Sequence, residues 1–118
     1  MTRQFNSIED ELHFVEFRQE LLFNNTGIDR LLFEYEITQE EYRKIMNLMD
    51  SMRNQLDNGE KISHGTFERK MYEIIPSHNG DYHMCEYIAR EFMDAGRWEE
   101  VFPALYGDMP KYQYLKKS

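Results

Sequence analysis

The chain has 118 residues and a net charge of −8, which is enough sequence for one domain with its own core. Aromatic residues make up 14% of the chain, which argues against disorder, and no apolar run approaches the ~20 residues that span a bilayer. Cys85 is the single cysteine and excludes an internal disulfide. No apolar run of the signal-peptide type follows Arg3, so we expect a cytoplasmic protein.

Most of the acidic excess lies in residues 1–60. Nucleic-acid binding needs lysine and arginine to neutralise phosphates, so this distribution disfavours it. An acidic half allows a basic protein partner, because complementary fields speed the encounter of two proteins. A second interpretation is that these acids only keep the surface solvated.

The first predicted helix begins at Ser7, with Asp10 at the position of a capping box. Its apolar residues form two stripes: Ile8, Leu12, Val15 and Leu22, broken by Gln19, and beside them Phe14, Phe17 and Leu21. Two stripes cover more of a helix than one partner needs, so we expect one to face the core and the other a second copy of the chain. The second stripe is our candidate interface. The alternative is a helix buried on both sides.

A short helix over Ile28–Tyr35 follows, and then the most clearly bounded helix of the chain, which begins at Thr38. Thr38 and Glu41 have the spacing of a capping box, and Gly59 suits the left-handed conformation that follows a helix. Five apolar residues recur at steps of three and four and predict its buried face: Tyr42, Ile45, Met49, Met52 and Leu56.

Two further helices are expected after the polar loop. Thr66 is the expected cap of the first, and Pro76 ends it. Asp81 caps the next, whose inner stripe is Cys85, Ile88, Ala89, Phe92 and Ala95. Gly96 ends that helix, and a short helix led by Arg97 and Trp98 completes an αα-hairpin.

No segment alternates apolar and polar residues at period two over a useful length. The predicted fold is therefore all-α: a single domain over residues 1–118, built as an antiparallel bundle of about five or six helices that ends in the αα-hairpin. Residues 1–6 and 108–118 are expected to be mobile termini.

The order of these segments resembles the YhaI-like family, small uncharacterised proteins of Bacillus-type bacteria grouped under a domain of unknown function. Four segments carry the resemblance: Ile8–Leu12, Ile37–Glu41, Gly65–Arg69 and Phe92–Phe102. It spans roughly residues 8–105, while the turn at Pro76–Gly80 and the tyrosine-rich tail depart from the family pattern. The resemblance implies the helical fold and brings no activity, cofactor or site.

His78, His83 and Cys85, with Asp81 and Glu86 nearby, are the best metal candidates, because zinc accepts these ligand types. Their spacing matches no recognised zinc pattern, and Cys85 falls on an apolar stripe, where a free cysteine is usually a small buried hydrophobe. The sequence has no glycine-rich phosphate loop and no nucleophile elbow. We therefore assign no catalytic residue, metal ligand or cofactor.

Nucleic-acid binding would depend on scattered bases beside aromatic side chains: Arg90, Arg97, Lys111, Lys116 and Lys117 with Trp98, Tyr112 and Tyr114. These bases do not form the footprint of a nucleic-acid-binding protein, and Trp98 at a hairpin is more typical of packing.

The sequence favours a non-enzymatic interaction module that forms a homodimer and contacts neither nucleic acid nor membrane. Its candidate interaction residues are Phe14, Phe17, Leu21, Trp98, Tyr112 and Tyr114. One form of this hypothesis is a small regulator or inhibitor that covers a basic nuclease or toxin, as a prophage or mobile-element accessory protein would. The alternative is a metal- or thiol-dependent enzyme centred on His78, His83 and Cys85.

Overall fold

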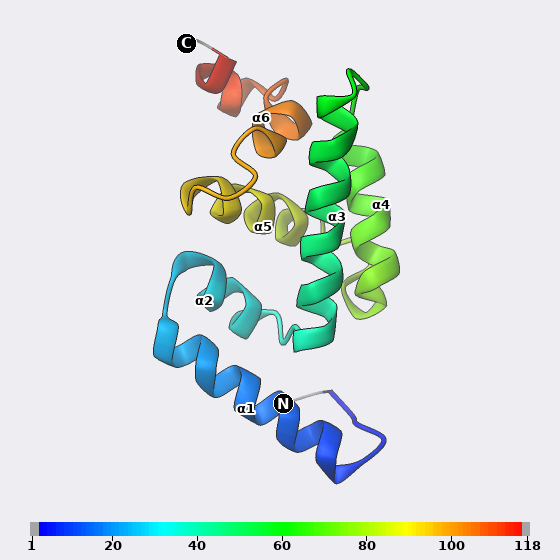
Figure 1. The fold of residues 1–118 in the computed structure, drawn as a ribbon, viewed down its shortest axis with the longest axis vertical. Coiled ribbons are helices and arrows are strands. Elements are labelled where there is room, and N and C mark those ends of the chain that lie inside the picture. Colours follow the sequence, from blue (N-terminus) through cyan, green and yellow to red (C-terminus); the bar gives the residue numbers. More distant parts are fainter. Residues whose placement is uncertain (1–2, 117–118) are drawn as a thin grey trace.

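The computed structural model describes residues 3–116 and confirms the all-α fold (Figure 1). This part of the chain contains helices and turns and no strand. The α-helices are α1 (Ile8–Asn24), α2 (Gly27–Glu34), α3 (Gln39–Asp57), α4 (His64–Ile74), α5 (Tyr82–Asp94) and α6 (Val101–Tyr106). Two 3-10 helices, η1 (Pro76–His78) and η2 (Pro110–Lys116), follow α4 and α6. The expectations for residues 1–2 and 117–118 lie outside the described residues.

Side-chain caps fix where most of these helices begin. Each cap accepts a hydrogen bond from the backbone N–H three positions later, and the caps are Ser7, Thr26, Thr38, Ser63 and Asp81. Thr38 and Glu41 form the predicted capping box, with bonds of 3.1 and 3.0 Å. The prediction that Thr66 caps α4 was wrong. Ser63 is the cap, because its hydroxyl accepts from the Thr66 N–H at 3.3 Å.

α3 and α4 form an antiparallel hairpin along the long axis of the molecule (Figure 1). The predicted buried face of α3 is largely confirmed: Ile45, Met49 and Met52 are buried, together with Leu48, while Tyr42 and Leu56 are partly exposed. Gly59 follows α3 with a positive φ of 80°, as predicted for the end of this helix.

α5 is enclosed from several sides. α2, α4 and α6 all pack against it, and α2 and α5 lie across the α3–α4 hairpin (Figure 1). The predicted inner stripe is confirmed at Cys85, Ile88, Ala89 and Phe92, whereas Ala95 is exposed at the end of the helix. Met84 and Glu86 are buried as well, so more than one side of α5 is covered.

The predicted αα-hairpin is formed by α5 and α6, but its second helix begins later than expected. Residues 95–100 form a turn, in which the Arg97 N–H donates to the Phe92 carbonyl at 2.8 Å and Gly96 has a φ of 75°. Trp98 also adopts the left-handed conformation, with a φ of 48°, so it belongs to the turn and α6 begins at Val101. A helical start at Arg97 is excluded by this backbone.

α1 packs mainly against α2 and lies at one end of a molecule that measures 48 × 26 × 24 Å (Figure 1). α2 separates α1 from α5, so α1 is the outermost helix of the stack. None of the helices in residues 3–116 combines the length and the apolar character that crossing a membrane requires.

The terminal segments predicted to be mobile are packed where the structure describes them. In the N-terminal arm (residues 3–6), Arg3 forms an ion pair with Glu41 and Phe5 contacts the ring of Phe14. At the other end, η2 places Tyr112 in the interior, where its ring meets Phe102 edge-on at 4.9 Å. Both segments are therefore held by long-range contacts.

Phe92 and Phe23 offer a matched pair of substitutions that tests this arrangement. Phe92 is fully buried between the rings of Tyr42 and Trp98, whereas Phe23 is 90% exposed on α1. We expect Phe92→Ala to lower the free energy of unfolding by about 3–5 kcal/mol because it leaves a cavity. Phe23→Ala should change it by less than about 0.5 kcal/mol. Urea denaturation of the two variants measures both values, and equal losses would contradict the fold.

Candidate interaction surface

The two apolar stripes of α1 differ in exposure, and one of them is covered by the rest of the chain. Phe14, Phe17 and Leu21 are buried. The ring centroid of Phe14 lies 5.1 Å from that of Phe5, and the centroid of Phe17 lies 6.3 Å from that of Tyr42. The structure thus corrects the assignment of these three residues to an interface with a second copy, because they face the chain's own interior.

The other stripe is open to solvent. Ile8, Leu12, Leu22 and Phe23 are 83%, 55%, 57% and 90% exposed, and we call these four residues the outer face of α1. Val15, between them, is partly buried, and Gln19 interrupts the stripe with a polar side chain. Single exposed apolar side chains are ordinary on protein surfaces, whereas several on one side of a helix are typical of an interaction site.

Acidic side chains border the outer face. Glu9, Glu16 and Glu20 follow one another by seven and four residues, so they lie along one edge of it, and Glu11 lies on the other side. All four are exposed, and none has an ion-pair or hydrogen-bond partner for its carboxylate among residues 3–116. The outer face therefore combines an apolar row with uncompensated negative charge.

Arg18, the only lysine or arginine of α1, does not offset this charge at the surface. Its Nη1 donates to the Phe33 carbonyl at 2.9 Å, and its guanidinium carbon lies 3.7 Å from the centroid of the Phe33 ring. Arg18 is thus committed to the contact between α1 and α2, and its hydrogen bond helps to hold the helix with its outer face exposed.

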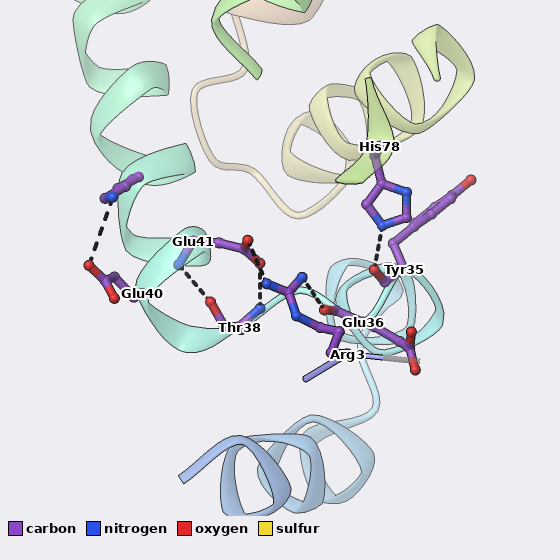
Figure 2. Close-up of polar contacts among 8 residues, drawn as sticks. Arg3, Tyr35, Glu36, Thr38, Glu40, Glu41 and His78 are labelled. Carbon is purple, nitrogen blue, oxygen red and sulfur yellow. Dashed lines mark hydrogen bonds and ion pairs between the residues drawn. The ribbon is translucent and has the colours of Figure 1, made fainter. Parts of the chain in front are cut away.

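A cleft of about 490 Å³ lies between the N-terminal arm, the start of α1 and the start of α3. Arg3 crosses it, donating to the Glu36 carbonyl at 3.1 Å and to the Glu41 carboxylate at 2.9 Å, while Glu41 also accepts from the Thr38 N–H (Figure 2). Among the described residues no buried side-chain nitrogen or oxygen lacks a hydrogen-bond partner. Arg3, Glu41 and Thr38 thus bond to other parts of the chain, and we assign no ligand to this cleft.

The structure does not bring the proposed metal ligands together. His78 Nε2 lies 2.7 Å from the Tyr35 carbonyl oxygen (Figure 2), whereas His83 is exposed and lies between the rings of Tyr82 and Tyr87. Cys85 is fully buried. Within residues 3–116 no three His, Cys, Asp or Glu side chains are grouped to hold a metal ion.

The thiol of Cys85 is also poorly suited to nucleophilic chemistry. Burial raises its pKa to about 12, and the nearby Glu68 carboxylate adds to the shift. The thiolate is the reactive form of cysteine, so a thiol held protonated at neutral pH is inert. The structure therefore gives no support to the alternative of a thiol-dependent enzyme.

The other candidate interaction residues divide between the interior and the surface. The Trp98 indole donates to Asp50 at 2.8 Å, and its ring meets Phe92 edge-on at 4.9 Å. Tyr112 is buried and donates to Glu86 at 2.6 Å. Only Tyr114 is exposed, at 56%, so the structure brings Trp98, Tyr112 and Tyr114 into no common surface with α1.

The sequence interpretation missed the stripe that is open, and it did not consider Phe23. One signal was present in the sequence: the stripe that contains the polar Gln19 is the one less suited to a buried position. The aromatic residues of the other stripe are the larger side chains, and burial of large aromatic side chains dominates core energetics.

The chain matches no known family model, no curated protein and no solved structure. The resemblance to the YhaI-like family stays a prediction.

Glu86 is the buried charge of the described chain and anchors η2 to α5. Its Oε2 accepts from Lys111 Nζ at 2.8 Å and from the Tyr112 hydroxyl at 2.6 Å. Burial alone raises the pKa of this carboxyl, but the hydrogen bonds from Lys111 and Tyr112 outweigh burial and hold its pKa below the ordinary glutamate value. The fold thus favours the ionised form of Glu86.

This direction of the pKa shift predicts how stability depends on pH. The contribution of ionised Glu86 is complete above the ordinary pKa of about 4.3 and is lost as the pH falls through the lower pKa of the folded state. We expect Glu86→Gln to lower the free energy of unfolding at pH 7 by about 1–3 kcal/mol, because a charged hydrogen bond is removed.

Urea denaturation of wild type and Glu86→Gln across pH 3–7 measures this effect. The difference between them should shrink at the acidic end, and Glu60→Gln, in an exposed loop, should match wild type throughout. A difference that does not change with pH would contradict the role of the charge.

Proposed function

We propose that this chain is a non-enzymatic protein-interaction module and that the outer face of α1 is its docking surface. The observation that carries the proposal is the set of four exposed apolar side chains, Ile8, Leu12, Leu22 and Phe23, on one side of a helix whose opposite face is buried. Helices commonly bind partners by laying such a row against another apolar surface. In this proposal the protein acts in a reducing cytoplasm as a small regulator or inhibitor of its partner.

Buried and partly buried polar side chains hold the fold together, and this supports a non-enzymatic role. Glu86 is held by η2, the Tyr106 hydroxyl donates to Glu68 at 2.9 Å, and His78 contacts a backbone carbonyl oxygen. Each of these groups has a partner that also holds the fold together.

A photo-crosslinking amino acid placed at residue 12 tests the docking surface in the native cell. We expect covalent adducts with a protein from this position and none from residue 58, which is also exposed but lies at the end of α3. Ile8→Ser and Leu22→Ser together should deplete the adduct. Each substitution removes about 1.5 kcal/mol of apolar burial at the interface. Each should therefore weaken the affinity for the partner roughly tenfold.

The same double variant should fold like wild type, because both side chains are exposed. Its circular dichroism and thermal midpoint are the control for the loss of adducts. Equal adduct yields from residues 12 and 58, or adducts that survive the double substitution, would show that the outer face of α1 is not the docking surface.

A further inference from the structure

The charge along α1 identifies the kind of partner that fits its outer face. We infer that the occupant is a basic amphipathic helix of another protein, an inference that rests on the proposed docking surface. Glu9, Glu11, Glu16 and Glu20 border the apolar row and lack partners among the described residues. Lysine or arginine side chains flanking an apolar stripe would neutralise them while their stems cover the edges of the row.

The spacing of the outer face fits a helix as its occupant. Ile8, Leu12, Val15, Gln19 and Leu22 recur by four and three residues, which is the heptad pattern by which two helices pack side by side. From Ile8 to Phe23 the row extends about 22 Å at 1.5 Å per residue. A partner helix of about four turns, with apolar residues at the same repeat, would cover it.

A second copy of this chain fits the same face poorly. In an antiparallel pair centred between Val15 and Glu16, each Leu12 would meet the polar Gln19 of the other copy, and the two Glu16 side chains would lie near the two-fold axis. Arg18, the one base of α1 that could pair with a glutamate of the other copy, is held on Phe33. Each copy would also bring a net charge of −8.

Two synthetic helical peptides test the inference with the purified full-length protein. Both have about 18 residues and leucine at the a and d heptad positions. One has lysine at the flanking positions and the other has glutamate. We expect fluorescence anisotropy to show binding of the leucine–lysine peptide alone, with a Kd that rises about tenfold or more between 50 and 300 mM salt, because exposed charges are screened. Leu12→Ser should weaken that binding about tenfold.

A pair of charge variants separates local complementarity from net charge. The triple variant Glu9→Gln, Glu16→Gln, Glu20→Gln should weaken binding of the leucine–lysine peptide about tenfold. The control variant Glu60→Gln, Glu73→Gln, Glu99→Gln removes the same charge from exposed positions outside α1, and its Kd should stay within about twofold of wild type. Equal weakening by both variants would overturn the inference, because only total charge would then matter.

Other outcomes distinguish a wrong partner from a wrong surface. Equal binding of the glutamate peptide, or a stable dimer in sedimentation that Leu12→Ser dissociates, would overturn the basic helix and leave the outer face as the docking surface. Failure of both peptides, with a monomeric protein and no adduct from residue 12, would overturn the proposed function as well.

Discussion

The enclosure of α5 is the constraint on which the arrangement of the other helices depends. Its buried residues point in more than one direction, so α2, α4 and α6 must all cover it, and η2 is fastened to it through Glu86. With α2 committed to α5, the outer side of α2 is left for α1. α1 therefore ends the stack, with one face on α2 and nothing in the described chain beyond its other face.

Because α1 ends the stack, its outer face is a surface that is both apolar and bordered by negative charge. The inner stripe of α1 is covered, and Arg18 fixes the rotation of the helix through its contact with Phe33. The outer stripe is apolar and exposed, and exposed glutamates border it. In the proposed interaction these charges would oppose contact with a second acidic copy and would speed the approach of a basic partner.

Local features of the fold could be predicted from the sequence, and distant ones could not. The capping box of Thr38 and Glu41, the cap at Asp81 and the glycine after α3 are set by neighbouring residues. Which stripe of α1 faces outward depends on where α2 lies, and periodicity is the same for both stripes. The bond between Tyr112 and Glu86 joins residues 26 positions apart, and the left-handed Trp98 is held by Asp50. No pattern of neighbouring residues in the sequence predicts either contact.

Hydroxyl-radical footprinting of the free protein at low concentration tests the central claim most directly, because it compares side chains of one type on the two faces of α1. The account predicts that Phe23 is oxidised several-fold faster than Phe14 and Phe17, and Leu12 and Leu22 faster than Leu21. Equal rates for Phe23 and Phe14, or protection of Phe23 and Leu12 in the free protein, would contradict it, since the outer face would then be covered.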